Sequence, residues 1–157
     1  MITGVQIIVI QNNKILIAKR NPLRKDGTER IGGGRWNLIG GKIDLGEDSY
    51  EAAKRETFEE AGLSLDQIVE VSAKINDWDP EYDPFYAHLF VAWVDDDQNV
   101  FLNEEHLSYQ FVELDELENV NLLGYDKDEI EIAITQAKSY SKYCEWMRVY
   151  DTPEGEK

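Results

Sequence analysis

Residues 41–63 read GKIDLGEDSYEAAKRETFEEAGL, and the rest of the chain can be interpreted from this stretch. Glu56, Glu59 and Glu60 are spaced i, i+3 and i+4, which places them on one face of a helix. Like charges at this spacing repel by roughly 0.2–0.5 kcal/mol per pair. A hard divalent cation prefers oxygen ligands and removes this repulsion. The stretch therefore predicts a helix that holds such a cation.

The residues around these carboxylates predict a glycine turn followed by the helix. The paired glycines at 40–41 end the preceding strand, one of the polar residues 48–49 caps the helix, and Gly62 ends it. Arg55 precedes Glu59 by four residues, so it can hold that carboxylate through an ion pair. A solvated acidic helix is the alternative for any single glutamate. The joint pattern beside a glycine turn favours a metal that serves phosphate chemistry.

This pattern resembles the Nudix box, G-x5-E-x7-R-E-U-x-E-E-x-G-U, in which U is a bulky aliphatic residue. The positions in register are Gly41, Glu47, Arg55, Glu56, Glu59, Glu60, Gly62 and Leu63. Thr57 departs from the pattern, because an aliphatic residue is usual there, but threonine is β-branched and fills much the same space. The flanking sequence also looks like the family over most of the length of the chain.

The resemblance implies a fold and an activity. The fold is of the α/β class, an α/β/α sandwich with a mixed β-sheet between helices. Nudix enzymes use Mg²⁺ or Mn²⁺ to hydrolyse a diphosphate linkage in a nucleoside diphosphate joined to another group. The metal ligands and catalytic residues implied by the resemblance are Glu56, Glu59 and Glu60, with the Gly41 carbonyl as a further ligand. Arg55 is implied to orient Glu59, and Glu47 to support the site.

A second feature of the family lies further along the chain. In many members a glutamate that is six residues before an aromatic residue serves as an additional metal ligand or as the general base. Glu105 and Phe111 fit this spacing, and Glu104 is the competing candidate. His106, which follows, is expected to be a surface histidine with no role.

Length and composition limit the other classes. The 157 residues suit one domain, residues 1–157. A net charge of -16 argues against duplex nucleic acid and anionic membranes as partners. It leaves small nucleotides open, because a metal bridges the two negative partners. Cys144 is the single cysteine, and no signal peptide or long apolar run is present, so a cytoplasmic location is expected. Many relatives are dimers, so the resemblance leaves a homodimer open.

Apolar runs outside the box predict the remaining elements. Residues 5–10 and 15–18 should form a hairpin around Asn12 and Asn13. Further strands are expected at 36–39, 68–75, 85–94, 100–101 and 111–114, with an acidic turn at 95–97. A short helix or turn should begin at 115–117. A helix is expected over about 127–148, packed on the sheet, and a frayed tail at 152–157.

Residues 20–35 are rich in Arg, Lys and Gly and are interpreted as a mobile loop. The loop is either a solvated connector or a region that meets substrate phosphates. The sequence Gly34-Arg35-Trp36-Asn37 resembles the corresponding segment of Nudix members that hydrolyse purine triphosphates, including oxidised ones. In those members the residue equivalent to Asn37 can touch the base. The substrate candidates are therefore Arg20, Arg35 and Asn37. Trp36 is expected in the core.

These features favour a nucleoside triphosphate pyrophosphohydrolase. ADP-ribose, nucleotide sugars, dinucleoside polyphosphates and capped RNA are alternative substrates, because the box does not choose among them. Their contacts would come from the loops at 20–35, 76–84 and 103–108, of which the second carries Trp78 and Tyr82. A Nudix domain that binds a nucleotide without hydrolysing it is an alternative of a different class. Such domains commonly lose box carboxylates that this chain keeps.

Overall fold

The chain begins with the predicted hairpin. The computed structural model describes residues 2–77 and 84–151, with side chains up to residue 140. β1 (Ile2–Gln11) and β2 (Lys14–Arg20) are joined by Asn12 and Asn13, whose φ angles are 52° and 62°. Asparagine tolerates this left-handed conformation, and a two-residue turn built from it matches the twist of paired strands. Ile10 pairs with Ile15, which confirms the hairpin.

The hairpin is part of a seven-stranded sheet. Its other strands are β3 (Trp36–Asn37), β4 (Ile39–Lys42), β5 (Gln67–Asn76), β6 (Phe85–Trp93) and β7 (His106–Val112). The strand order is β3-β2-β1-β6-β5, with β4 also paired to β1 and β7 to β2. β1 and β6 run parallel, whereas the other paired strands are antiparallel. The sheet is therefore mixed, as expected.

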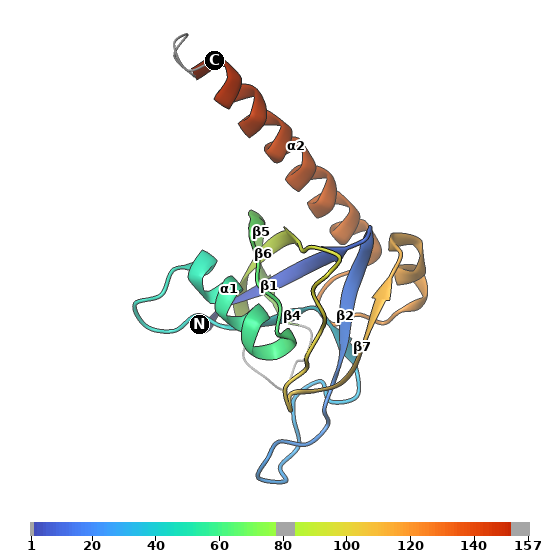
Figure 1. Ribbon diagram of the computed structural model, residues 1–157. Coiled ribbons are helices and arrows are strands. Elements are labelled where there is room, and N and C mark those ends of the chain that lie inside the picture. Colours follow the sequence, from blue (N-terminus) through green and yellow to red (C-terminus); the bar gives the residue numbers. More distant parts are fainter. Residues whose placement is uncertain (1, 78–83, 152–157) are drawn as a thin grey trace.

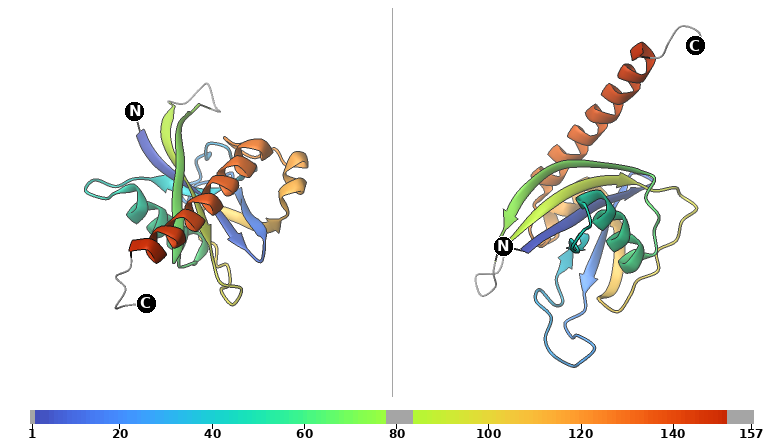
Figure 2. Two further views of the ribbon diagram at one scale, coloured as in Figure 1. Left: turned by 90° about the horizontal axis from the view of Figure 1, so that it is seen from above. Right: turned by 90° about the vertical axis from the view of Figure 1, so that its left-hand side faces the viewer.

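Helices cover both faces of this sheet (Figures 1 and 2). Alternate residues of β1 point to opposite faces. Val5, Ile7 and Val9 pack with α1 (Ser49–Ala61), whereas Ile8 and Ile10 pack with η1 (Leu114–Asn119) and the first turns of α2 (Lys127–Asp151). The two cores confirm the predicted α/β/α sandwich. The last turns of α2 extend beyond the sheet (Figure 1).

Several predicted boundaries need correction. Residues 100–101 form no strand, because the Phe101 N–H donates to the Ala61 carbonyl at the end of α1 (2.8 Å). β7 begins at His106 instead of Phe111, because the whole segment 106–112 pairs with β2. The strand expected at 36–39 is split into β3 and β4.

Other predictions are confirmed or lie outside the described residues. Trp36 packs against the core under α2, and the Gln98 N–H donates to the Asp95 carbonyl (3.2 Å), closing the acidic turn. Trp78, Tyr82 and the tail at 152–157 lie outside the described residues.

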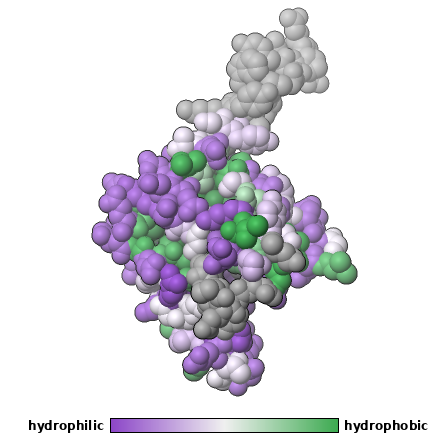
Figure 3. All heavy atoms as spheres, turned by 180° about the vertical axis from the view of Figure 1, so that it is seen from behind, coloured by the Kyte–Doolittle hydropathy of each residue, from purple (hydrophilic) through white to green (hydrophobic). Residues whose placement is uncertain are grey.

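The surface reflects the polar composition. Viewed from behind, hydrophilic side chains cover most of the face, and apolar side chains show in small groups (Figure 3). Among the described residues, no helix combines the length and the apolar character needed to cross a membrane.

Candidate functional site

Helix α1 carries the box glutamates, and its two ends are built as predicted. Asp48 caps the helix, since its Oδ1 accepts a hydrogen bond from the Glu51 N–H (2.8 Å). Gly62 ends it with a φ of 70°, a conformation that favours glycine. Thr57 is fully buried and donates its hydroxyl to the Ala53 carbonyl (2.8 Å). The residue that departs from the box pattern is thus satisfied within the helix.

Glu56 lies directly against the backbone of Gly41 in β4. Any side chain at Gly41 would collide with the Glu56 carboxylate, so glycine is required for this close approach. The carboxylate accepts a hydrogen bond from Arg55 Nη1 (2.8 Å). Burial raises the pKa of Glu56, although Arg55 acts in the opposite direction. The first glycine of the box therefore lets a helix carboxylate reach the strand.

Glu60, from α1, and Glu105, from the loop before β7, have carboxyl groups that lie close to each other. Glu60 is 3% exposed, and its Oε2 accepts from the Gly40 N–H (3.2 Å). Burial, and then the neighbouring Glu105, raise the pKa of Glu60 well above its ordinary value. Glu104 is exposed and pairs with Lys25 instead (3.0 Å). Of the two candidates, Glu105 is therefore the one beside the box.

Arg55 is the cation that ties this acidic cluster together. Its Nε and Nη2 donate to the two carboxylate oxygens of Glu47, at 2.8 and 3.0 Å, and Nη2 also donates to the Lys42 carbonyl (2.9 Å). The hydrogen bonds with Glu47 raise the pKa of Arg55 and lower that of Glu47. Nη1 contacts Glu59 at 3.1 Å, as the i, i+4 spacing predicts, but the Glu59 side chain is 54% exposed. Arg55 thus binds Glu47 more extensively than Glu59.

The donor set of the cluster suits a hard divalent cation. Glu56, Glu60 and Glu105 supply carboxylate oxygens, and the pKa values of the first two are raised by burial close to other carboxylates. A divalent cation can take the place of a proton on the buried carboxyl group of Glu60. Within the described residues, no three acidic, histidine or cysteine side chains already converge as a chelating group. Binding an ion therefore requires side-chain rotation, most simply of the exposed Glu59.

A cleft of about 260 Å³ opens beside these carboxylates. Its walls come from β1, β4, the last residues of β2 and β3, and the adjoining ends of β5 and β6, together with Ile31 and Leu123. Gly40 and Gly41 line the cleft and also contact Glu60 and Glu56, respectively. A short stretch of glycine backbone is therefore all that separates the cleft from the acidic cluster.

Two of the three predicted substrate residues, Arg20 and Asn37, line this cleft. The Asn37 amide is satisfied when its oxygen accepts from Arg20 Nη1 (3.1 Å) and its nitrogen donates to His106 Nε2 (3.1 Å) and the Ala18 carbonyl (2.9 Å). Burial lowers the pKa of Arg20. The two residues are thus held in a fixed network at one wall of the cleft.

His106 belongs to this network, so the prediction of a surface histidine is wrong. It is 5% exposed, and burial, followed by the charge of Arg20, lowers its pKa to about 4. The ring is therefore neutral at physiological pH. The reason is the early start of β7, which pairs His106 with Arg20 and draws the ring inward.

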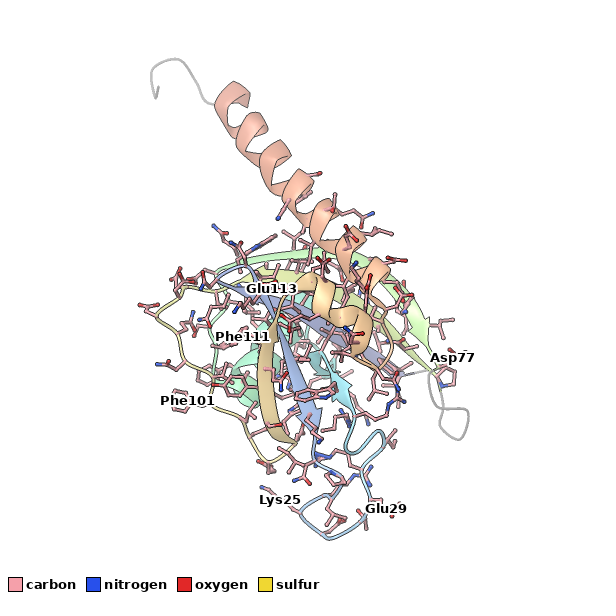
Figure 4. All side chains as sticks on the ribbon, turned by 90° about the vertical axis from the view of Figure 1, so that its right-hand side faces the viewer. Lys25, Glu29, Asp77, Phe101, Phe111 and Glu113 are labelled. Atoms are coloured by element: carbon pink, nitrogen blue, oxygen red, sulfur yellow. The ribbon has the colours of Figure 1, made fainter. Side chains whose placement is uncertain are left out.

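The other basic side chains of the loop bind main-chain and side-chain oxygens outside the cleft. Their partners are the Glu29 carbonyl for Arg24 (2.8 Å), the Glu104 carboxylate for Lys25 (3.0 Å), the Glu105 carbonyl for Arg30 (3.2 Å) and the Asn121 amide oxygen for Arg35 (3.1 Å). Lys25 and Glu29 lie at the tip of the loop, away from the sheet (Figure 4). Among these loop cations, Arg20 alone lines the described cleft, and a substrate role for Arg35 stays a prediction.

Two further polar residues line the cleft: Gln6, which sequence reasoning missed, and Asn76, which it included only as the first residue of the substrate-contact loop 76–84. They are 8% and 4% exposed, and Asn76 Nδ2 donates to Gln6 Oε1 (2.8 Å). A signal for Gln6 was present, since it is the one polar residue within the apolar run 5–10. No pattern singles out Asn76 within the loop 76–84, because it stands where a strand passes into a turn-rich segment.

Comparisons with known proteins agree with this geometry. The sequence profile of the NUDIX domain matches residues 2–134. Oxidized purine nucleoside triphosphate hydrolase of Mus musculus is 31% identical over 111 residues, which cover 71% of this chain and 65% of that protein. The Danio rerio protein of the same name is 31% identical over 86 residues, 55% of this chain and 51% of that protein. The chain spans less than two thirds of the length of these relatives.

A solved structure shows the same fold. The crystal structure of a MutT protein from Methanosarcina mazei Go1 matches with a TM-score of 0.69 at 24% identity, covering 87% of this chain and 95% of that one. The profile match spans most of the chain, and the box residues stand in register around the acidic cluster. The chain therefore belongs to the NUDIX domain family.

Proposed function

We propose that the chain is a metal-dependent pyrophosphohydrolase that cleaves a diphosphate linkage in a nucleoside triphosphate. The observation that carries the proposal is the buried carboxyl group of Glu60, which lies close to Glu56 and the half-buried Glu105 and contacts Gly40 at the edge of the cleft. Buried carboxyls close together are unfavourable for stability alone, and such perturbed groups cluster at functional sites. The names of the mouse and zebrafish relatives, oxidized purine nucleoside triphosphate hydrolases, support the same class of substrate.

The residues proposed to hold Mg²⁺, or Mn²⁺ in its place, are the Gly41 carbonyl, Glu56, Glu59, Glu60 and Glu105. When bound, the ion would neutralise phosphate charge and make water more acidic. Arg55 would keep Glu56 and Glu59 in place through its hydrogen bonds at 2.8 and 3.1 Å. Glu47 in turn fixes Arg55 with two hydrogen bonds. Arg55 and Glu47 thus brace the cluster without lining the cleft.

A glutamate would take the proton from the attacking water, and Glu105 or a box glutamate can serve. A carboxylate with a raised pKa is the stronger base. Burial raises the pKa of Glu60 and of Glu56, and Glu105 lies beside Glu60. Glu60 and Glu56 are therefore suited to accept the proton.

The cleft is proposed to hold the nucleoside part of the substrate. Its volume of about 260 Å³ lies just below the range of about 300–1,000 Å³ of whole small-molecule sites. A base and part of a sugar therefore suit it better than a complete nucleoside triphosphate. The phosphates would pass along Gly40 and Gly41 toward the carboxylates, and Arg20 supplies a positive charge in the cleft wall. Asn37 lies in the same wall.

The test is product analysis on a panel of nucleoside triphosphates, oxidised purine triphosphates, nucleotide sugars, ADP-ribose and dinucleoside polyphosphates. Each is incubated with the protein in Mg²⁺, in Mn²⁺ and in EDTA. The proposal predicts metal-dependent release of a nucleoside monophosphate and pyrophosphate from a triphosphate. Glu60→Gln is expected to abolish this activity. Its matched control is Glu51→Gln, on the exposed first turn of the same helix, which should stay active.

The other outcomes of this panel distinguish the alternatives. Metal-dependent cleavage of ADP-ribose, a nucleotide sugar or a dinucleoside polyphosphate, with triphosphates left intact, would replace the substrate class and keep the reaction. Binding of a nucleotide without any turnover would contradict the proposal and assign the chain to the non-catalytic class.

A further inference from the structure

Gln6 is an anomaly in an apolar strand. Side chains of β1 alternate between the two cores, and Ile8 and Ile10, which share a face with Gln6, are buried hydrophobic residues. Gln6 is 8% exposed on this face. A buried amide costs stability unless its polar atoms find partners, so a residue selected for packing alone would be aliphatic. The position therefore calls for a reason beyond the core.

The amide of Gln6 is oriented by its neighbour. Asn76 Nδ2 donates to Gln6 Oε1 (2.8 Å), which uses the carbonyl end of the glutamine. Gln6 Nε2 then carries the two N–H groups. Within the described residues, it donates to no side chain or carbonyl, and Gln6 lines the cleft. The side-chain N–H groups of Gln6 are thus available in the cleft to donate to a ligand.

The other amide at the wall differs from it. Asn37 also lines the cleft, but its oxygen is engaged by Arg20 and its nitrogen by His106 and the Ala18 carbonyl. Asp77 borders the cleft at the end of β5, and its exposed carboxylate can only accept (Figure 4). Of the three side chains, Gln6 is the one with a buried donor available to a ligand.

We propose that Gln6 is a specificity-determining residue, which selects a nucleobase that presents a carbonyl oxygen to its side-chain N–H groups. A 6-oxopurine offers that oxygen, whereas adenine presents an amino group that would set donor against donor. Sites that hydrogen-bond one group of a substrate discriminate against analogues that leave the buried group unpaired. This inference rests on the proposed nucleotide substrate, and Asn76 acts through Gln6 by fixing its orientation.

The test compares inosine triphosphate with adenosine triphosphate, which differ only in the hydrogen-bonding edge that includes C6. The wild-type protein is expected to favour the inosine nucleotide in kcat/KM by about tenfold or more, in line with one buried hydrogen bond gained and one polar clash avoided. Gln6→Glu is nearly isosteric and still accepts from Asn76, but it presents an acceptor to the base. It is expected to shift the ratio toward adenosine triphosphate by at least about tenfold.

Two further variants complete the design. Gln6→Met removes the donor at similar length and should bring the ratio to within about threefold of unity. Gln136→Glu adds the same charge as Gln6→Glu on the exposed side of α2 and should keep the wild-type ratio. Thermal unfolding of all four proteins checks that they are folded. The ratio compares kcat/KM for two substrates of the same protein, so a loss of activity toward both substrates does not alter it.

Two results would overturn the inference: a wild-type ratio near or below unity, or a folded Gln6→Glu variant that keeps the wild-type ratio. Failure of the proposed function appears differently, as absence of hydrolysis of either nucleotide by the wild-type protein. In that case calorimetric binding of inosine and adenosine monophosphates to the same proteins decides the matter. The inference then requires the same preference and the same shift in dissociation constants.

Discussion

Helix α1 and the loop at 21–35 are both dense in charge, and they use it in opposite ways. Carboxylates of the helix lie close to one another around Arg55, and burial raises the pKa of Glu56 and Glu60. The cations of the loop each find an oxygen partner, such as the Glu29 carbonyl for Arg24. The loop cations are paired with oxygens of the protein, and these pairs help to fix the path of the backbone. The helix carboxylates lie close together despite their mutual repulsion, which indicates a site for a ligand.

The two regions meet at Glu105. Its carboxyl group joins Glu60, while its backbone carbonyl accepts from the Asn21 N–H (2.8 Å) and from Arg30 Nη1 (3.2 Å). The loop thus supports the cluster by holding the main chain of one member. Mutations in the helix are expected to change chemistry, and mutations in the loop to change it only through this contact.

The largest effect is expected for Glu60→Gln. The variant keeps the volume but removes a charge at the centre of the cluster, so turnover should fall by at least about 10³-fold. In EDTA the same variant should unfold at a higher temperature than the wild-type protein, because a buried ionisable group has become neutral. Steady-state kinetics and thermal unfolding measure the two effects. Near-normal turnover in a folded variant would remove Glu60 from the mechanism.

The next effect concerns His106, at the border of the two regions. Its pKa in the folded protein is about 4, against about 6.5 when unfolded, so the folded state favours the neutral ring. This contribution is present above pH 6.5 and is lost as the pH falls toward 4, about 3 kcal/mol in all. Wild-type protein should therefore lose more unfolding free energy between pH 7 and 4.5 than His106→Gln. Urea titrations at the two pH values measure the difference.

His88 supplies the control for this titration, since it is the other histidine of the chain and is bound to Glu70 at 2.6 Å. His88→Gln should keep the excess acid sensitivity that His106→Gln removes. Equal losses in the wild-type protein and in His106→Gln would show that His106 is not held neutral by the fold.

A smaller effect is expected for Arg30→Met. Loss of one hydrogen bond to the Glu105 carbonyl should lower kcat by about three- to tenfold, because the Asn21 N–H still holds that carbonyl. KM should change less than kcat, since Arg30 does not line the cleft. A change confined to KM would instead indicate that Arg30 meets the substrate.

The smallest effect is expected for Lys25→Gln. Its ion pair with Glu104 is exposed at the tip of the loop, where water and salt screen the attraction, so it contributes little. Turnover should stay within about twofold of the wild-type value. A large loss of turnover would show that the tip of the loop closes on the substrate. The loop and the helix would then both take part in the reaction.

Local features of this chain could be predicted from its sequence. The cap at Asp48, the end at Gly62 and the turn at Asn12 and Asn13 depend on neighbouring residues only, and each is found in the structure. The apolar runs at 5–10 and 15–18 likewise predicted two strands, which are parts of β1 and β2. The choice of Glu105 over Glu104 came from the family spacing, and the structure brings Glu105 beside Glu60.

Features that depend on distant contacts could not be predicted. His106 is buried because β7 pairs with β2 from its first residue. This pairing joins distant segments of the chain, so no local sequence pattern predicts it. The amide pair of Gln6 and Asn76 joins residues 70 positions apart. The partners of the loop cations likewise follow from the folded path of residues 21–35, since three of the four, those of Lys25, Arg30 and Arg35, lie in distant segments of the chain.

The central claim is that Glu56, Glu60 and Glu105 form one centre for a divalent cation. Electron paramagnetic resonance of free Mn²⁺, titrated with the wild-type protein and with Glu60→Gln, tests it without any substrate. We predict saturable binding to the wild-type protein, and a dissociation constant raised by at least about tenfold in the variant. Equal affinity in the two proteins, or no saturable binding to the wild-type protein, would contradict the claim.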